Sequence, residues 1–395
     1  MTPPEPPQRV GVVGAGTMGA GIAQVCLAGG HDVLLYDVEP GAVERGRARI
    51  EDGLRRSVAR GRMAESERAA ALARLGAAAS LADLAAASDL VIEAALEDLA
   101  LKRTIFRELD AAARPDVPLA SNTSALSIDA IAEATTRPER VLGLHFFNPA
   151  PLMALVEVVA GTRTSAVAMR VGSDFVAAMG KTPVACGDAP GFIVNRVNRP
   201  FTLEALRMIE AGEGTVGLVD AAVQAGGYPM GPFALMDLVG IDVNLAVADA
   251  LWRAFDEATR FRPSPIQRAL VRAGRLGRKS GRGFYRYDAA GGMTGIAPLP
   301  TGLTAAAVSA IPSEEIVPRL ELAVINEAYH AAGEGVADPR DIDLAMRLGA
   351  GHPYGPFERA RALGLGTVVR GLRRFEERYG ERYRVAHALW QIAAI

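Results

Sequence analysis

The sequence predicts an α/β fold in which an N-terminal doubly wound domain with a parallel sheet precedes an all-α C-terminal domain that is partly duplicated. Two observations predict this. Short apolar strand-like runs alternate with amphipathic helical segments over residues 9–188, which is typical of βαβ units. After Pro190 and Gly191 the sequence becomes nearly all helical, and one helical pattern recurs about 124 residues later.

Composition points to a globular protein that acts on small molecules. The 395 residues, half of them hydrophobic and 22% charged, suit two or three domains. A net charge of −2 lacks the basic excess of a nucleic-acid binder. Cys26 and Cys186 lie far apart, without a Cys/His cluster, so neither disulfides nor a metal site is expected. No apolar run reaches membrane-spanning length, and we expect a cytoplasmic protein with no membrane partner and a flexible leader over residues 1–8.

A glycine-rich motif follows the first apolar run. The segment GAGTMG has GxGxxG spacing, which allows a tight turn, contact of a pyrophosphate with bare backbone and close helix–strand packing. The next run ends on Asp37, about 20 residues on, where an acid accepts ribose hydroxyls. Val38 and Glu39 follow, without an arginine for a 2′-phosphate, which favours NAD over NADP. The motif predicts a Rossmann-type domain with cofactor contacts at Gly14, Gly16, Thr17, Met18, Gly19 and Asp37; the alternative is a glycine turn without a cofactor.

Helical sequence over about residues 40–75 forms an insertion in this domain. Seven of its arginines lie close together, at positions 45, 47, 49, 55, 56, 60 and 62. They could hold a phosphorylated ligand, or they could form a solvated helix face, which is the commoner role of such a cluster.

Polar side chains end a later strand-like run, LASNTS. Strand ends of an open parallel sheet line its ligand crevice, so Asn122 and Ser124 are candidates to face cofactor or substrate. Ser124 could also cap the helix that begins near Ile128, although Ser127 is better placed for that role.

Residues 141–159 place one histidine and one carboxylate in apolar sequence. His145 lies in the first of two strand-like runs and Glu157 in the second, on either side of a turn with Asn148 and Pro149. An ionisable pair among apolar residues costs stability unless the two groups satisfy each other, so we expect a His–Glu hydrogen bond, which is how a general base is oriented. The alternative is that His145 fills a half-buried strand while Glu157 faces water.

The second half divides into a helical domain over 189–287, a proline-punctuated linker over 288–312, and a degenerate copy of the domain over 313–395. Glu204 corresponds to Glu327, and the Gly-Pro-Phe turn at 231–233 to that at 355–357. The second copy has no match to residues 192–196 and offers Pro318 and Arg319 instead, so we expect it to keep the packing and lose the chemistry.

Two polar residues of the helical domain are candidates for ligand contacts. Asn195, on an apolar helix, can bond a substrate oxygen or another helix. Lys279 lies in a basic glycine-rich turn and can reach a phosphate or a carboxylate.

The chain resembles the short-chain L-3-hydroxyacyl-CoA dehydrogenases, including bacterial 3-hydroxybutyryl-CoA dehydrogenases, through GAGTMGAGIA, SNTSALSI, GLHFFNPAPLMALVEVV, DAPGFIVNRV, GYPMGPF and GRKSGRGFY. The resemblance implies NAD-dependent, reversible oxidation of (S)-3-hydroxyacyl-CoA to 3-ketoacyl-CoA in fatty-acid or related acyl-CoA metabolism, such as β-oxidation. It implies that His145 is the catalytic base and Glu157 its orienting partner, and that Ser124 and Asn195 contact the reacting oxygen. The residues that it implies contact NAD are Asp37, Glu97, Lys102, Asn148 and Lys279.

The same resemblance bears on coenzyme A and on assembly. It implies that the insertion helps to bind coenzyme A, with Arg56 and Arg60 as candidate contacts and with Gly53 about where the family has a serine. The short enzymes pair two chains through their helical domains, whereas in multifunctional β-oxidation proteins a duplicated copy looks like an internal substitute for the partner. We therefore expect either a homodimer or a monomer with an internal pseudo-dimer.

Two other functions fit the same fold. A gulonate-type NAD-dependent sugar-acid dehydrogenase resembles this family over the same motifs. A non-catalytic structural role is known for a lens protein of this fold, but packing does not demand the combination of Ser124, His145, Glu157 and Asn195.

Overall fold

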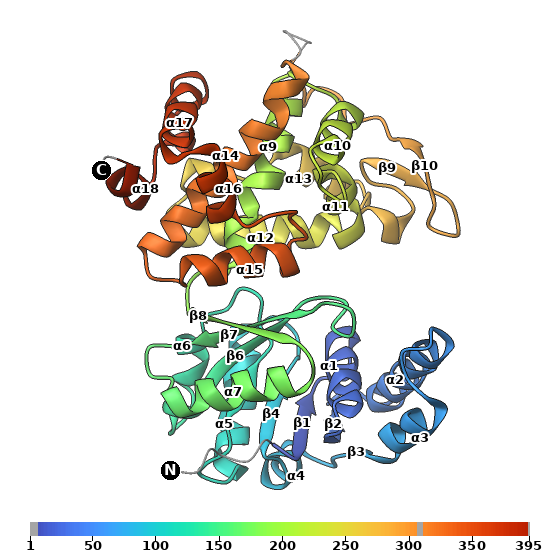
Figure 1. The fold of residues 1–395 in the computed structure, drawn as a ribbon. Helices are drawn as coiled ribbons and strands as arrows, with labels where there is room; N and C mark the ends of the chain where they lie inside the picture. The colour runs from blue at the N-terminus through green and yellow to red at the C-terminus, as the bar shows by residue number, and fades with distance from the viewer. Residues whose placement is uncertain (1–6, 306–310, 394–395) are drawn as a thin grey trace. The chain divides into compact units, whose positions relative to one another are not determined.

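The computed structural model describes residues 7–305 and 311–393, so most of the predicted leader and part of the predicted linker lie outside the described residues. The chain forms two compact units, Met1–Phe192 and Ile193–Ile395 (Figure 1). Among the helices of the described ranges, none is both long enough and apolar enough to cross a membrane.

An eight-stranded sheet with the order β3-β2-β1-β4-β5-β6-β7-β8 forms the centre of the first unit. Neighbouring strands are parallel except β6 and β7, which run antiparallel on either side of the turn predicted within residues 141–159. The predicted parallel α/β domain is therefore confirmed. The strands are β1 Arg9–Val13, β2 Asp32–Tyr36, β3 Leu75–Ala77, β4 Leu90–Glu93, β5 Leu119–Ser121, β6 Val141–Phe146, β7 Leu155–Ala160 and β8 Thr182–Gly187.

Helices cover both faces of this sheet. Val10 and Val12 of β1 are fully buried in a core that also contains Ile22 of α1 and Phe175 of α7, and Figure 1 shows α1 and α7 in front of the sheet. Gly11 points to the opposite face, where a Cβ would lie 2.4 Å from Leu84 of α4. The helices are α1 Thr17–Ala28, α2 Ala42–Ala59, α3 Glu65–Ala73, α4 Leu81–Ala87, α5 Leu99–Ala112, α6 Ile128–Ala132 and α7 Ala166–Ala178, with a 3₁₀ turn η1 at Pro138–Arg140.

The described helices of the second unit fall into two series along the chain, one before β9 and one after β10. The first contains α8 Val194–Val197, α9 Arg199–Glu210, α10 Val216–Ala225, α11 Pro232–Val239, α12 Ile241–Ala254, η2 Thr259–Phe261 and α13 Pro265–Arg272. The second contains α14 Ser313–Gly333, α15 Pro339–Gly349, α16 Pro356–Leu363, α17 Leu365–Tyr379, η4 Glu381–Tyr383 and α18 His387–Ala393. Between the two series lie η3 Arg278–Ser280, β9 Tyr285–Tyr287 and β10 Met293–Ile296.

The Gly-Pro-Phe turns of the two series have the same construction. In the first series Asp220 accepts hydrogen bonds from Phe233 N and Ala234 N, each at 2.9 Å. In the second, Asp343 accepts a bond from Phe357 N at 2.7 Å and one from the next amide at 3.1 Å. A Cβ on the glycine of either turn would lie 2.3 Å from this aspartate, so both turns require glycine.

The predicted linker and leader are partly ordered. Met293–Ile296 pairs antiparallel with Tyr285–Tyr287, and Gly291, with φ at +79°, permits the turn between the strands. At the other end of the chain, Pro7 is buried and its carbonyl oxygen lies 2.7 Å from Nδ1 of His31. The leader was expected to be flexible, whereas its last two residues, Pro7 and Gln8, are held by hydrogen bonds with His31 and Asp89.

Candidate active site

The glycine-rich loop leaves open space beside its backbone. Gly14 has φ at +98°, and a Cβ there would lie 2.6 Å from the carbonyl oxygen of Ala94. A Cβ on Gly19 would lie 1.8 Å from the carbonyl oxygen of Gly14, so both positions require glycine. A Cβ on Gly16 would meet nothing within 4 Å, and no side chain of the described residues caps the start of α1 there. The loop and the helix N-terminus therefore fit the pyrophosphate of a dinucleotide.

Asp37 lies directly beyond the end of β2 and contacts this loop. Its Oδ2 accepts a hydrogen bond from Ala15 N at 2.7 Å, and its Oδ1 accepts one from Glu39 N at 2.9 Å. The carboxylate is only half-buried, so it keeps acceptor capacity for ribose hydroxyls.

Glu97 holds the turn that carries Ser124. Its Oε1 accepts hydrogen bonds from Ser124 N at 2.8 Å, from Ser124 Oγ at 3.2 Å and from Thr123 Oγ1 at 2.7 Å. Burial opposes ionisation of Glu97, but the charge of Lys102 and these hydrogen bonds outweigh it, and the pKa of this carboxyl lies below its ordinary value. Glu97 is therefore an anionic anchor for the Ser124 turn.

A buried ion pair lies behind Glu97. Lys102 is 1% exposed, and its Nζ lies 2.6 Å from Glu93 Oε1 and 3.4 Å from Glu97 Oε2. Glu93 is fully buried and also accepts a bond from Ser121 Oγ at 2.7 Å. The sequence analysis did not single out Glu93, although a carboxylate that ends the apolar run DLVIE resembles Asp37 at the end of β2.

Asn122 joins two strand ends. Its Oδ1 accepts a hydrogen bond from Phe146 N at 2.8 Å, so the end of β5, which precedes Ser124, is tied to the end of β6. His145 is the next-to-last residue of β6. The polar residues predicted at these two strand ends therefore lie at the same edge of the sheet.

His145 and Glu157 face each other across the antiparallel strands β6 and β7. His145 Nδ1 lies 2.6 Å from Glu157 Oε2, and the exposed fractions of the two residues are 6% and 0%. The rings of Phe147 and Phe192 lie 4.5 and 5.7 Å from the imidazole. The predicted hydrogen bond is present, and with Nδ1 engaged by Glu157 the nitrogen left to exchange a proton with a ligand is Nε2.

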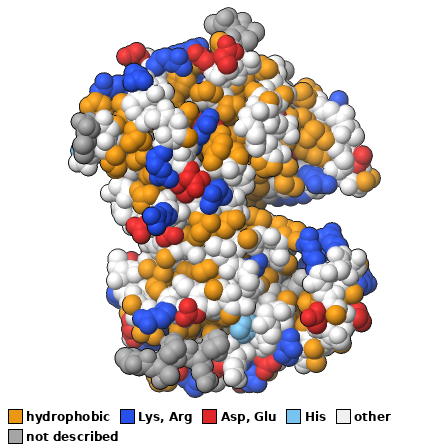
Figure 2. Space-filling view, in the orientation of Figure 1, with side chains coloured by type: hydrophobic (Ala, Val, Ile, Leu, Met, Phe, Trp, Pro, Cys, Tyr) orange, Lys and Arg blue, Asp and Glu red, His pale blue; other side chains and the backbone are white. Residues whose placement is uncertain are grey.

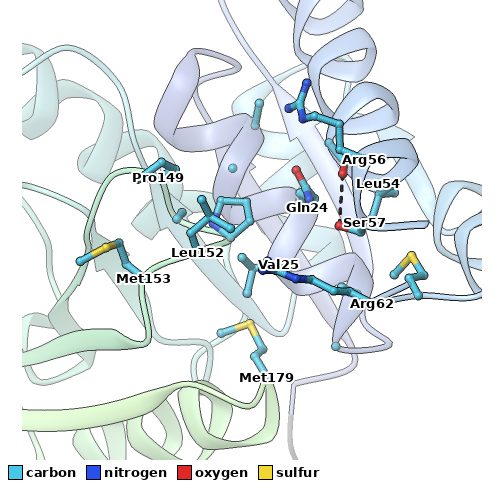
Figure 3. Close-up of a pocket in the computed structure, with 18 of the residues that line it drawn as sticks. Gln24, Val25, Leu54, Arg56, Ser57, Arg62, Pro149, Leu152, Met153 and Met179 are labelled. Carbon is cyan, nitrogen blue, oxygen red and sulfur yellow. Dashed lines mark hydrogen bonds between the residues drawn. The ribbon is translucent and has the colours of Figure 1, made fainter. Parts of the chain in front are cut away.

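A pocket of about 710 Å³ lies in the first unit, along α1 and α2 and beside the loop at residues 148–154. Figure 3 shows its two sides: Leu152, Met153 and Met179 on one, and polar residues from α1 and α2 on the other. Asn148, predicted to contact NAD, is exposed and lines the same pocket.

Arginines of the insertion line the polar side of this pocket. Arg56 forms an ion pair with Asp52, whereas Arg60 and Arg62 have no ion-pair partner among the residues that the structure describes. Arg62, which the sequence analysis had not distinguished from its neighbours, extends toward Val25 (Figure 3). Figure 2 shows Lys and Arg side chains gathered on the side of this unit where α2 lies. A mixed apolar and cationic lining suits a ligand that has both an apolar part and phosphates.

Gly53, where the resemblance led us to expect a serine, packs against Gln24. A Cβ on Gly53 would lie 2.0 Å from Gln24 Oε1, so the Gln24 side chain occupies the space that a serine would need. Two further predicted residues belong to the second unit. Asn195 is half-buried on α8, and Lys279 Nζ lies 2.7 Å from Asp242 in an exposed ion pair.

The described part of the chain holds no group of three or more His, Cys, Asp or Glu side chains that could bind a metal ion. At this edge of the sheet, the contact with Glu157 gives His145 the geometry of an oriented general base, on the domain that carries the dinucleotide loop. Together with the fold, this arrangement makes the chain an NAD-dependent oxidoreductase.

Comparison with known families agrees and is more specific. The model described as "3-hydroxyacyl-CoA dehydrogenase, NAD binding domain" matches residues 9–189. The model described as "3-hydroxyacyl-CoA dehydrogenase, C-terminal domain" matches residues 191–287 and 316–394. The chain belongs to the 3-hydroxyacyl-CoA dehydrogenase family.

Relatives match the whole chain or its first three quarters. A 3-hydroxyadipyl-CoA dehydrogenase of Escherichia coli K12 is 38% identical and matches over 98% of both chains. A 3-hydroxybutyryl-CoA dehydrogenase of Mycobacterium tuberculosis H37Rv is 47% identical over 71% of this chain and 98% of its own length. A solved 3-hydroxybutyryl-CoA dehydrogenase from E. coli K12 superposes with a TM-score of 0.88, at 37% identity and 98% coverage of both chains.

Proposed function

We propose that this protein oxidises (S)-3-hydroxyacyl-CoA reversibly to 3-ketoacyl-CoA in fatty-acid or related acyl-CoA metabolism, with NAD as the redox cofactor. The observation that carries the proposal is the 2.6 Å contact between the buried His145 and Glu157 at the sheet edge where the dinucleotide loop also lies. The names of the relatives support an acyl-CoA substrate.

His145 is the general base of the proposed reaction. Bound NAD supplies a hydride acceptor, and the protein has to remove the hydroxyl proton. His145 Nε2 takes this proton, while Glu157 holds Nδ1–H and stabilises the imidazolium that forms. In the reverse direction the imidazolium of His145 returns the proton to the oxygen.

Ser124 and Asn195 hold the reacting oxygen. A hydroxyl and an amide N–H can both donate to an oxygen that gains negative charge during ketone reduction. Support for Ser124 comes from Glu97, which fixes the Ser124 turn through the backbone N–H of Ser124; the single hydroxyl proton of Ser124 has to leave Glu97 in order to reach the substrate oxygen.

The cofactor contacts that we propose combine backbone and side-chain groups. Gly14, Gly16 and Gly19 give access to the pyrophosphate, and Asp37 accepts ribose hydroxyls. Lys102 is so deeply buried that we assign it to the support of Glu97. The remaining proposed contacts are Thr17, Met18, Asn122, Asn148 and Lys279.

We assign the pocket along α1 and α2 to coenzyme A. Its arginines suit the phosphates, and its apolar side suits the pantetheine chain. Arg60 and Arg62 are better placed for phosphate than Arg56, because Asp52 already neutralises the Arg56 guanidinium.

One assay separates this proposal from its alternatives. The enzyme should oxidise NADH with acetoacetyl-CoA and reduce NAD with (S)-3-hydroxybutyryl-CoA, and it should not reduce NAD with gulonate. Activity with gulonate alone would assign it to the sugar-acid dehydrogenases. Inactivity with all three, in a preparation that binds NADH, would support a structural role. (S)-3-Hydroxyadipyl-CoA belongs in the same panel, since one relative is named for it.

We further propose that residues 189–287 and 313–395 are two copies of one helical domain and that the protein is a monomer. Two-fold dimers are recognised by reciprocal contacts across the interface. In this chain Arg196 of the first series bonds Glu327 of the second, and Arg319 of the second bonds Glu204 of the first. The second copy thus occupies the place of a partner subunit. Light scattering at micromolar concentration should give the mass of one chain, and the mass of two would overturn this proposal.

The compartment that we propose is the cytoplasm. Both cysteines, Cys26 and Cys186, are free and buried, as is usual for proteins of a reducing compartment.

A further inference from the structure

The short helix α8 carries Asn195 and depends on tertiary contacts for its position. It spans only the four residues Val194–Val197, and an isolated helix of that length is not stable in water. Val194, Arg196 and Val197 are buried, whereas Asn195 is half-buried. Contacts that fix Arg196 and the buried valines therefore also fix the backbone from which the Asn195 side chain extends.

Arg196 is the polar anchor of this helix, and carboxylates of the second series bind it. Its Nε donates to Glu327 Oε1 at 2.7 Å, and its Nη1 lies 2.7 Å from Glu334 Oε2. Its guanidinium lies over the ring of Phe255 at 4.6 Å. Arg196 and Glu327 are each 1% exposed, so the pair cannot exchange its bonds for water without local opening.

The carboxylates and guanidinium groups around Arg196 stabilise each other's charges. Burial lowers the pKa of Arg196, but Glu334 and Glu327 more than compensate, so the guanidinium stays charged. Arg260 Nε donates to the other oxygen of Glu327 at 2.8 Å, which leaves Glu327 held from both sides. A helix end that is fixed through a charged fork of this kind has little freedom to rotate.

The second series has an equivalent arginine anchor, Arg319, which has no asparagine beside it. Arg319 bonds Glu204 at 3.2 Å and also pairs with Glu213, and its guanidinium lies over the ring of Tyr379 at 3.9 Å. The residue before Arg319 is Pro318, which stands where Asn195 stands before Arg196. The sequence predicted Pro318 and Arg319 in place of this segment, and of these two residues the arginine has carboxylate partners like those of Arg196.

We propose that Glu327 and Glu334 are positioning residues for the reaction, because through Arg196 they set the orientation in which Asn195 meets the substrate oxygen. This inference rests on the proposed function and gives the second copy a part in catalysis beyond packing. The symmetric cluster at Arg319 has the same structural role without a substrate contact.

The test uses two matched substitutions in the full-length protein. Glu334→Gln neutralises one of the carboxylates that pair with Arg196. Glu213→Gln neutralises the corresponding carboxylate that pairs with Arg319. Neither carboxylate is fully buried, so both variants should fold. We expect Glu334→Gln to lower kcat/KM for acetoacetyl-CoA about tenfold. Glu213→Gln should stay within about twofold of wild type with a similar change in Tm, and both should keep the wild-type Kd for NADH.

A double-variant cycle tests whether Glu334 acts through Asn195. If it does, adding Glu334→Gln to Asn195→Ala should cost no further activity. Equal losses in the two matched variants, or additive losses in the cycle, would overturn the positioning role. Full activity of Asn195→Ala would overturn it as well, while leaving the dehydrogenase assignment intact. Failure of the dehydrogenase assignment would instead appear as inactivity of the wild-type protein toward acyl-CoA.

Discussion

Removal of the charge of Glu157 is the sharpest test of the catalytic pair. The variant Glu157→Gln keeps the shape of the side chain and an oxygen that can accept the hydrogen bond from His145 Nδ1. What it loses is the attraction between a carboxylate and the imidazolium that forms when His145 takes the proton. Because Glu157 is fully buried, water cannot replace this attraction.

The size of the effect follows from the geometry. With the Nδ1–Oε2 distance of 2.6 Å, the two charges are centred about 4 Å apart, which gives about 4 kcal/mol at an effective dielectric constant of about 20. A lower bound comes from replacing a charge-assisted hydrogen bond with a neutral one, which costs roughly 1–2 kcal/mol. We therefore expect kcat to fall by about 10-fold to 1000-fold.

The assay is NADH oxidation with acetoacetyl-CoA, together with NADH binding followed by fluorescence. His145→Gln should lose most turnover, and the double variant should be no slower than His145→Gln alone, because Glu157 acts through His145. The Kd for NADH should not change in any of these variants. A Glu157→Gln enzyme with kcat within threefold of wild type would refute the reasoning.

Three further substitutions test other parts of the site. Glu97→Gln should lower kcat about tenfold by loosening the Ser124 turn. The folded-state pKa of Glu97 lies below its ordinary value of 4.5, so its ionised form adds stability that is lost as the pH falls through the folded pKa, and urea unfolding of the variant should depend less on pH in that acid range. Arg60→Ala should raise KM for acetoacetyl-CoA about fivefold but leave KM for acetoacetyl-pantetheine, which lacks the nucleotide, unchanged. Asp37→Asn should weaken NADH binding about tenfold. It should also reduce the preference of the enzyme for NADH over NADPH, since it removes a negative charge from the ribose site.

For each of these three predictions, one outcome would contradict the reasoning behind it. An unchanged kcat for Glu97→Gln would mean that the Ser124 turn is held without this carboxylate. Equal rises in both KM values for Arg60→Ala would show that the nucleotide of coenzyme A does not bind in this pocket. Unchanged nucleotide preference for Asp37→Asn would show that its charge does not discriminate against a 2′-phosphate.

The sequence predicted the parts of the fold that depend on local patterns. The glycine spacing and the acid at Asp37 belong to one βαβ unit, so their geometry follows from a short segment. The contact between His145 and Glu157 was predictable for a similar reason: two apolar runs joined by a short turn place these residues on adjacent strands. Their family roles came from the resemblance.

Other features depend on contacts that a linear pattern does not encode. The Glu93–Lys102 pair joins the end of a strand to a helix, and no sequence pattern predicts that these two residues contact each other. Arg319 was predicted in place of the segment that contains Arg196, but its carboxylate partners are distant in the sequence and were not predictable. In three dimensions the guanidinium and its carboxylates define the correspondence.

The crossed pairs have a consequence for shorter versions of this chain. A protein that ended after residue 287 would keep Arg196 and Glu204 but lose Glu327 and Arg319, the partners that they have here. Glu204 would keep its ion pair with Arg207, but the buried Arg196 would lose both Glu327 and Glu334. An unpaired buried charge is costly, so such a fragment would be poorly stable alone. In a pair of such fragments, Arg196 of each chain could bond Glu204 of the other, in place of Glu327 and Arg319. A stop codon at that point would therefore change the number of chains that assemble, with no new interface residue required.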